Sequence, residues 1–196
     1  MTKALTPPET EVGQLTAFVG ADLHDLCDAA ESSILDGGGF GWLAPPPRGV
    51  MESYWTGVLL VPDRQLFVAR LDGTISGSAQ LVRPPRNNEA QAPCGTLTTF
   101  FIAPWARGFG FAPRLVQAVE DAARASDLQV LNLDVRATQE RAIQVYEQLG
   151  FSRWGEHPHY AFVDSSWLTG YYYWKNLTGD SLSQSMELAD DGAAER

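Results

Sequence analysis

The chain has 196 residues, of which 44% are hydrophobic and 19% are charged, and its formal net charge is -10. This composition is typical of a globular protein of one domain and excludes a disordered chain. An acidic chain without a basic patch argues against a nucleic-acid-binding protein, because phosphate binding requires clustered cations. The apolar runs are far shorter than the roughly 20 residues of a membrane span, so we expect a cytoplasmic protein without a membrane partner.

Polar sequence without hydrophobic periodicity marks both ends of the chain. We expect a flexible segment over residues 1–12, a single domain over 13–178 and an acidic, flexible tail over 179–196. The two cysteines, Cys27 and Cys94, have neither the spacing of a metal site nor that of a disulfide framework. The sequence therefore predicts no metal centre, and we expect a monomer or a homodimer.

The predicted elements of the first half begin with a strand over residues 14–19. A helical period of apolar residues predicts a helix over 21–35, which ends at the glycines that follow it. A loop rich in glycine and proline leads to a second helix, predicted over 50–60. Asp72 and Gly73 lie between two β-rich runs and predict a hairpin with a type I′ turn.

The second half alternates strands and helices. In chain order the predicted elements are a strand over 95–103, a helix over 112–126, a strand over 128–135, a helix over 140–149 and two final strands over 151–154 and 171–177. The segment 156–160 is expected to be a loop. Antiparallel strands combined with one strand–helix–strand unit predict the α+β class, a mixed sheet with flanking helices. We expect the parallel crossover to be right-handed.

The strongest chemical signal comes from residues 104–115, where a predicted strand ends and a helix begins. A helix N-terminus has free backbone N–H groups and the positive end of the helix dipole, so it binds anions. Gly108 and Gly110 allow the backbone to turn these groups toward a pyrophosphate. A tight turn alone would explain the glycines equally well. A dinucleotide fingerprint lacks its third glycine, where Pro113 stands, and a nucleoside-triphosphate loop lacks its Gly-Lys-Ser/Thr end.

Arg107, Gly110 and Ala112 resemble the acetyl-CoA loop of the GNAT family of N-acetyltransferases, whose pattern is Arg/Gln-x-x-Gly-x-Gly/Ala. A second family motif, Asn-x-x-Ala followed by Tyr and Gly-Phe, matches the run 133–151, with Gln139 in place of the Asn. The likeness extends loosely to the tabtoxin-resistance branch. It implies a GNAT-like acyl-CoA N-acyltransferase fold. It also implies transfer of an acetyl group from acetyl-CoA to an amine of a small-molecule or peptide-like acceptor, by direct attack in a ternary complex.

The resemblance also implies which residues bind acetyl-CoA. Backbone donors come from the central strand, the loop and helix start hold the pyrophosphate, and an amide side chain donates to the pantetheine arm. The implied cofactor-binding residues are Phe100, Phe101, Ile102, Arg107, Gly108, Phe109, Gly110, Phe111, Ala112, Gln139 and Tyr146.

Two catalytic residues are predicted. Tyr146 matches the helix tyrosine of the family, which implies that it protonates the departing thiolate, although its position alone also fits a core tyrosine. The central strand lacks the glutamate that many family members use as a base. Asp134 is the best candidate base, because strand alternation places it opposite the apolar Leu133 and Val135, near the end of its strand. An ion pair with Arg136 would explain Asp134 equally well.

His157 and His159 are alternative bases, since a histidine binds a proton near neutral pH. The acceptor pocket is expected to be formed by the region between the first two helices, together with the loop before the last strand. The expected pocket residues are Phe40, Trp42, Tyr54 and His157. The alternative function is an acyl-CoA-binding or sensing module of the same fold without turnover.

Overall fold

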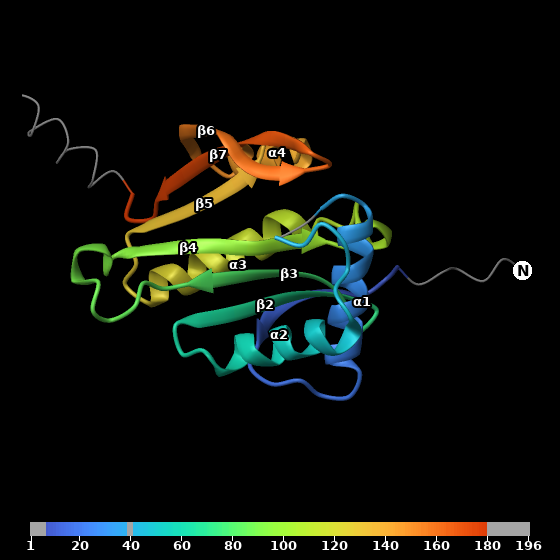
Figure 1. The fold of residues 1–196 in the computed structure, drawn as a ribbon. Coiled ribbons are helices and arrows are strands. Elements are labelled where there is room, and N and C mark those ends of the chain that lie inside the picture. Colours follow the sequence, from blue (N-terminus) through green and yellow to red (C-terminus); the bar gives the residue numbers. More distant parts are fainter. Residues whose placement is uncertain (1–6, 39–40, 180–196) are drawn as a thin grey trace, which may run out of the picture.

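The computed structural model describes residues 7–38 and 41–179. Its elements are strands β1 (Thr10–Leu15), β2 (Arg64–Leu71), β3 (Thr74–Val82), β4 (Cys94–Ile102), β5 (Val130–Arg136), β6 (Ser152–Val163) and β7 (Ser166–Asn176), and helices α1 (Asp22–Leu35), α2 (Arg48–Leu60), α3 (Phe111–Ala125) and α4 (Glu140–Gln148). The strands form one seven-stranded sheet in the order β1-β2-β3-β4-β5-β7-β6. Among the strands of the described residues, only β4 and β5 pair in parallel. Helices α1 and α2 cover one face, and α3 and α4 cover the other (Figure 1).

The predicted α+β architecture, a mixed sheet with flanking helices, is confirmed. Most predicted helices and strands lie within two residues of their observed bounds. The β2–β3 hairpin has positive φ at Asp72 (49°) and Gly73 (82°), as a type I′ turn requires. These elements were predictable because each presents one apolar face to a buried cluster.

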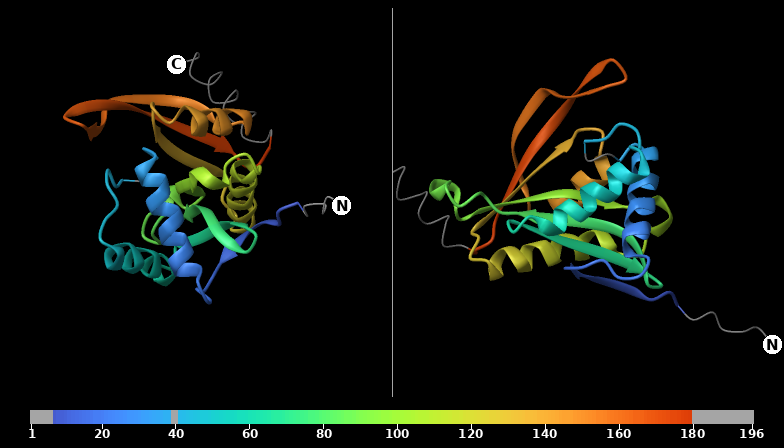
Figure 2. Two further views of the ribbon diagram at one scale, coloured as in Figure 1. Left: turned by 90° about the vertical axis from the view of Figure 1, so that its right-hand side faces the viewer. Right: turned by 60° about the horizontal axis from the view of Figure 1, so that its bottom comes forward.

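Three predicted regions differ from the structure, and one of them is the last strand, which spans Ser166–Asn176 rather than 171–177. The first strand spans Thr10–Leu15 rather than 14–19, so residues that we expected in a flexible N-terminal segment pair with β2. The segment 156–160, expected to be a loop, belongs to β6, which forms a long antiparallel hairpin with β7. The hairpin projects past the rest of the sheet (Figure 2), and most of β6 is exposed. Its sequence therefore lacks the alternation by which a half-buried strand is identified.

Two buried apolar clusters hold the layers together. The cluster beneath α3 and α4 includes Leu115 and Leu131, and the cluster beneath α1 and α2 includes Trp55 and Phe101. Complete burial of such a side chain stabilises the fold by about 1.5–3 kcal/mol. Each strand therefore has a fixed face toward each helix layer, and this determines where its polar side chains point.

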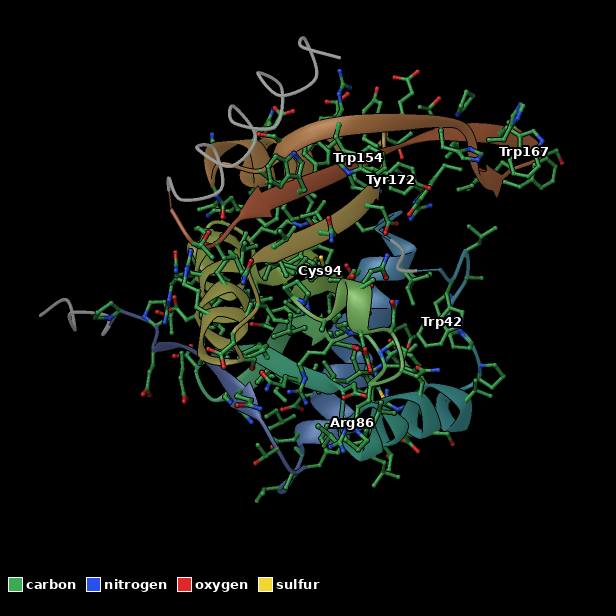
Figure 3. The ribbon with its side chains drawn as sticks, turned by 90° about the vertical axis from the view of Figure 1, so that its left-hand side faces the viewer. Trp42, Arg86, Cys94, Trp154, Trp167 and Tyr172 are labelled. Carbon is green, nitrogen blue, oxygen red and sulfur yellow. The ribbon has the colours of Figure 1, made fainter. Side chains whose placement is uncertain are left out.

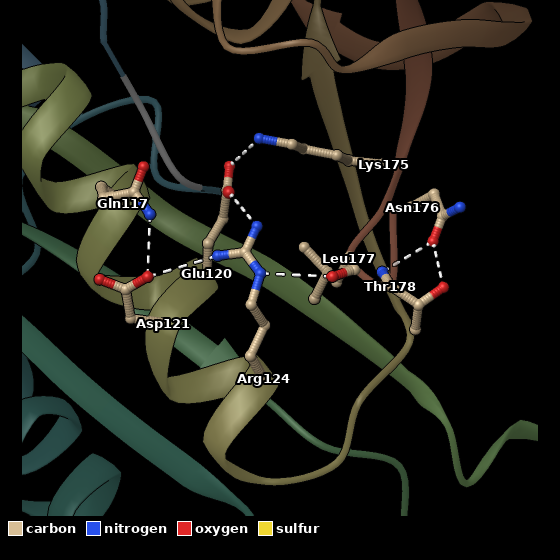
Figure 4. Close-up of polar contacts among 8 residues, drawn as sticks. All are labelled: Gln117, Glu120, Asp121, Arg124, Lys175, Asn176, Leu177 and Thr178. Carbon is tan, nitrogen blue, oxygen red and sulfur yellow. Dashed lines mark hydrogen bonds and ion pairs between the residues drawn. The ribbon is translucent and has the colours of Figure 1, made fainter. Parts of the chain in front are cut away.

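A buried carboxylate ties α3 to the end of β7 (Figure 4). Glu120 is 1% exposed, and its carboxylate lies 2.6 Å from Lys175 Nζ and 3.0 Å from Arg124 Nη2. Arg124 Nε also donates to the carbonyl of Leu177 at 3.3 Å. Because a buried charge requires partners, these contacts fix α3 against β7. Strand β7 pairs with β5, so the position of β5 is fixed as well.

The sheet opens between β4 and β5. Their parallel pairing joins Cys94–Thr96 to Val130–Asn132, and beyond these residues the two strands diverge (Figure 1). The divergence leaves the second half of β4 without β5 as a hydrogen-bonding neighbour in the described chain. Backbone groups of β4 are therefore available to a ligand that enters between the strands.

A β-bulge at Thr99 accompanies the divergence. Thr99 has a φ of 51°, and the register between β3 and β4 shifts between Ser78 and Gln80. In a regular strand Leu97 and Phe101 would share a face. Here Leu97 packs with α3 and Phe101 packs with α1 and α2, because the extra residue changes the phase of the alternation.

Candidate active site

The gap between the diverging strands is a cavity of about 680 Å³. Its wall comes from β4, β5, the starts of α3 and α4, the α1–α2 loop and the β6–β7 hairpin. The sequence-predicted residues that line it are Trp42, Phe100, Phe101, Ile102, Arg107, Ala112, Asp134, Gln139 and Tyr146. Ligand sites in proteins have volumes of about 300–1,000 Å³, so this cavity has the size of a site for an organic ligand.

The N-terminus of α3 lies beside this cavity with its backbone open. Gly108 and Gly110 have φ of 87° and 73°, a conformation that favours glycine. A Cβ atom at either position would meet nothing within 4 Å. Among residues 7–38 and 41–179, no backbone carbonyl accepts the N–H groups of Gly108, Phe109 or Gly110. Phe111, the first residue of α3, follows directly. Free N–H groups at the positive end of a helix dipole form an anion site.

Two further predicted cofactor residues contact the end of α1. Arg107 Nη2 lies 2.6 Å from Asp36 Oδ2, and both side chains are partly exposed. Such an ion pair contributes at most about 1 kcal/mol, so a phosphate can replace Asp36 as the partner of Arg107. Gln139 Nε2 donates to the carbonyl of Gly37 at 2.9 Å. An amide nitrogen has two hydrogens, so one remains for a ligand.

Tyr146 lies on α4, is 4% exposed and lines the cavity. Its ring packs against Phe100, Phe151 and Tyr173, with centroid separations of 5.6, 5.9 and 6.4 Å. Its hydroxyl has no hydrogen-bond partner in the part of the chain that the structure describes. Burial, and secondarily the charge of Asp134, raises the pKa of Tyr146 far above its usual value. The hydroxyl is therefore protonated at neutral pH and free to donate.

Asp134 faces the α1–α2 side of the sheet, because it alternates along β5 with the buried Leu133 and Val135. Its partner is Tyr160 of β6, whose hydroxyl donates to Asp134 Oδ2. Within the described residues no ion pair joins Asp134 to Arg136, whose Nη2 donates to the carbonyl of Gly37 at 3.4 Å. Tyr160 lines the cavity beside Asp134, and the sequence analysis did not identify it.

Tyr160 reaches Asp134 by crossing β7, which lies between β6 and β5. The crossing takes place over Gly170, where a Cβ atom would lie only 2.1 Å from Tyr160 Cγ. The ring of Tyr172, two residues along β7, makes an edge contact with Tyr160 at 6.2 Å. Burial, followed by the hydrogen bond to Asp134, raises the pKa of Tyr160 well above its usual value. A glycine inside an aromatic-rich strand is a sign of close approach, so the sequence signals that another group packs over Gly170, but it does not identify that group as Tyr160.

The four predicted acceptor residues have four different outcomes. Trp42 lines the cavity. Tyr54 lies behind it, with its ring 5.1 Å from that of Trp42 and its hydroxyl 3.3 Å from Thr99 Oγ1. Phe40 lies outside the described residues. His157 does not line the cavity, because it stands on an exposed part of β6 rather than in a loop.

The two histidines of β6 interact with each other and with the hairpin. His157 Nδ1 accepts the backbone N–H of His159 at 3.1 Å, and the His159 ring packs 5.4 Å from Trp167. Figure 3 shows Trp167 near the far end of the hairpin, with Trp154 and Tyr172 together on its body. Neither histidine contributes to the cavity wall, so Asp134 is the better-placed base.

The described residues give little evidence for a metal site, a disulfide or a membrane-spanning helix. In the described ranges no three His, Cys, Asp or Glu side chains gather as metal ligands. Cys27 is buried, Cys94 is partly buried and both are free thiols. No helix among the described residues is long and apolar enough to cross a bilayer.

Comparison with known proteins adds independent findings. The model of the acetyltransferase (GNAT) family matches residues 33–151. An uncharacterized N-acetyltransferase from the hisH-hisA intergenic region of Azospirillum brasilense is 62% identical over 133 residues, which are 68% of this chain and 79% of that protein. The yncA structure from Salmonella typhimurium with its cofactor acetyl-CoA has a TM-score of 0.69 at 14% identity, over 88% of this chain and 96% of that one. A phosphinothricin acetyltransferase from Sinorhizobium meliloti, in complex with acetyl-CoA, has a TM-score of 0.70 at 20% identity, over 89% and 91% of the two chains.

At these identities the solved structures establish a shared fold, and the GNAT-like fold expected from the sequence is confirmed. The match to the family model covers more than half of the chain. The chain belongs to the GNAT family of acetyltransferases.

Proposed function

We propose that the protein is an N-acetyltransferase that transfers the acetyl group of acetyl-CoA to an amine of a small-molecule or peptide-like acceptor, by direct attack in a ternary complex. The open N-terminus of α3 beside the cavity between β4 and β5 is the observation that carries the proposal. Two structures of the same fold contain acetyl-CoA. The narrower resemblance to tabtoxin-resistance acetyltransferases stays a prediction.

The residues on the cofactor side suit a CoA ester. The N–H groups at Gly108–Ala112, together with Arg107, bind the pyrophosphate, since they combine free donors, a helix dipole and space for oxygen atoms. The divergent part of β4, Phe100–Ile102, offers backbone donors to the acyl and pantetheine groups. Gln139 donates its second amide hydrogen to the same arm. Bound acetyl-CoA supplies an activated acyl carbon, and the protein contributes binding and orientation.

On the acceptor side Asp134 takes the proton of the attacking amine. Tyr160 occupies only Oδ2, which leaves Oδ1 for the amine and holds the carboxylate in one orientation. As the new C–N bond forms and the C–S bond breaks, Tyr146 donates its proton to the sulfur. General acid and base catalysis of this kind contributes about 10²–10⁴ in rate.

The acceptor is an amine with an apolar or aromatic body. Trp42, Tyr160 and Phe162 line the cavity together with Asp134, so aromatic surface lies near the one carboxylate among the described lining residues. Arg136 and Arg141 also line the cavity. Aromatic rings also stabilise a nearby cation by about 0.5–2 kcal/mol, which helps to hold an ammonium group before it is deprotonated. A CoA ester as donor and two free cysteines suit a cytoplasmic enzyme.

The binding step is tested by thermal unfolding with CoA. At a hundredfold excess over its dissociation constant, CoA is expected to stabilise the protein by about 2.7 kcal/mol. Gly110→Glu should abolish this gain, because a carboxylate would occupy the anion site. Gly73→Glu is the matched control, since Gly73 also has positive φ, meets nothing within 4 Å and lies in the β2–β3 turn rather than at the start of α3. Wild-type protein that is not stabilised by millimolar CoA would refute the proposal.

Turnover is tested by free-thiol release from acetyl-CoA with a panel of amines. CoA binding without thiol release from any amine would favour a sensing module. For the base, Asp134→Asn should lower kcat while it leaves CoA affinity unchanged, and the loss should shrink as the pH approaches the pKa of the acceptor amine. Loss of the acidic limb of the pH–rate profile in His157→Ala/His159→Ala, but not in Asp134→Asn, would assign the base to β6.

A further inference from the structure

A chain of polar side chains runs from β2 to the wall of the cavity. Arg64 Nη1 donates to Gln80 Oε1 at 3.2 Å, and Gln80 Nε2 donates to the Tyr54 hydroxyl at 3.2 Å. The Tyr54 hydroxyl lies 3.3 Å from Thr99 Oγ1. Gln80 is fully buried and Thr99 is 7% exposed, so the inner bonds lie in a low-dielectric environment that strengthens them.

The direction of these hydrogen bonds follows from the groups that form them. An arginine only donates, so the carbonyl of Gln80 must face Arg64 and its NH₂ group must face Tyr54. In the described part of the chain, Thr99 Oγ1 is the only acceptor within reach of the Tyr54 hydroxyl hydrogen. Either hydroxyl can donate in this pair. The assignment that also satisfies the Tyr54 hydrogen has Tyr54 as the donor, and it leaves the hydroxyl hydrogen of Thr99 for another acceptor.

The backbone of Thr99 is strained. Its φ of 51° lies in the left-handed region, which is rarely occupied by a β-branched residue and costs about 1–3 kcal/mol. The Ser78 hydroxyl holds this conformation by donating to the Thr99 carbonyl at 3.1 Å. Glycine or asparagine would relieve the strain, so a threonine here sacrifices stability at a residue that lines the cavity.

We infer that the Thr99 hydroxyl donates a hydrogen bond to the acyl oxygen of bound acetyl-CoA, an inference that rests on the proposed function. Thr99 precedes the divergent segment Phe100–Ile102. Backbone N–H groups alternate in direction along a strand, so those of this segment that point away from β3 face the gap between β4 and β5. Negative charge develops on the acyl oxygen during acyl transfer, and donors already aimed at it lower the barrier. Thr99 is thus a catalytic residue. Arg64, Gln80 and Tyr54 are positioning residues that orient its hydrogen.

The inference is tested by calorimetric titration with CoA and with acetyl-CoA, which differ only in the acyl group. Thr99→Val keeps the shape of the side chain and removes the donor, so it should weaken acetyl-CoA binding about two- to tenfold, as expected for one hydrogen bond, and leave CoA binding unchanged. Thr99→Ser restores the hydroxyl and should restore the wild-type ratio of affinities. Tyr54→Phe removes the group that orients the Thr99 hydroxyl. The ratio of acetyl-CoA affinity to CoA affinity should then lie between those of the wild type and Thr99→Val. Thr96→Val, on the same strand but outside the cavity wall, is the control.

The outcomes separate this inference from the proposed function. Wild-type protein that fails to bind CoA refutes the function itself. Wild-type protein that binds CoA, with a Thr99→Val variant that weakens both ligands equally or neither, leaves the function intact and refutes the role of Thr99. Melting temperatures of the valine and serine variants show that both remain folded. A selective loss with acetyl-CoA, reversed by serine, supports the inference.

Discussion

Replacing Gly170 by alanine is expected to impair the proposed base, Asp134, although neither Asp134 nor its partner Tyr160 is changed. The new Cβ would lie 2.1 Å from Tyr160 Cγ and 2.5 Å from both Cδ atoms, whereas ordinary contacts are 3.4–4 Å. The ring must therefore retreat by more than about 1 Å, and a hydrogen bond does not survive such a displacement. Tyr160 is only half-buried and can turn outward, so the free energy of unfolding should fall by no more than about 1–3 kcal/mol.

The expected kinetic loss follows from the bond that is broken. The Tyr160 hydroxyl holds the Asp134 carboxylate in one orientation. A positioned general base contributes about 10²–10⁴ in rate, so a base that loses this orientation should lower kcat by about tenfold or more. Tyr160→Phe removes the same bond directly and should give the same kcat. Because both changes act on one contact, the double variant should be no slower than either single variant.

The assay is steady-state acetylation of the best amine from the panel, with CoA affinity measured in parallel. Gly155→Ala is the matched control on the same hairpin, because its Cβ would make ordinary contacts of 3.7 and 3.8 Å with Tyr172. CoA affinity should be unchanged in all variants. A Gly170→Ala enzyme with wild-type kcat, or additive losses in the double variant, would refute the role of the crossing.

Three further predictions concern single residues. Tyr146→Phe should lower kcat by about 10²-fold or more with unchanged CoA binding; an unchanged kcat, with chemistry shown to be rate-limiting, would make Tyr146 a core residue only. Asp22, whose hydrogen bond from Arg70 lowers its pKa below the ordinary 3.8, should stabilise the fold above that pH and lose this effect as the pH falls through its folded-state pKa. Asp22→Asn should therefore unfold more easily by about 1–3 kcal/mol at pH 7, and the difference from wild type should vanish in acid; a difference independent of pH contradicts the linkage. Lys175→Met should lower the free energy of unfolding by about 1–3 kcal/mol, because the buried Glu120 keeps only Arg124, and an unchanged denaturation midpoint would show that one cation suffices.

The residues proposed to bind the cofactor could be singled out in the sequence because their signal is local. Gly108 and Gly110 stand where a strand ends and a helix begins, and the free N–H groups of a helix start are a property of any helix. The order of elements was predictable for a related reason. Each helix and each inner strand must bury one face, and that requirement appears in the sequence as a period.

The residues proposed for the acceptor side could be singled out only in part, because their arrangement depends on strand register. Alternation along β5 correctly placed Asp134 on the polar face, but no local pattern pairs it with Tyr160, which is 26 residues away and two strands across the sheet. β6 could not be predicted from hydrophobic periodicity, because most of its residues are exposed. The bulge at Thr99 was hidden as well, since threonine is a common strand residue and its left-handed φ follows from the contacts of β3 with β4.

The proposed cofactor side and the proposed acceptor side should respond differently to amino-acid substitution. The groups proposed to bind CoA are mostly backbone N–H groups, whose positions depend on the chain path at α3 and β4. The groups proposed to receive the amine are side chains that meet only if β5, β7 and β6 keep their register. A slip of one residue in the hairpin would turn Tyr160 to the opposite face and leave the anion site at Gly110 untouched. Substitutions in the hairpin should therefore alter acceptor choice and base orientation while the affinity for CoA stays constant, so the two halves of the site are free to vary independently.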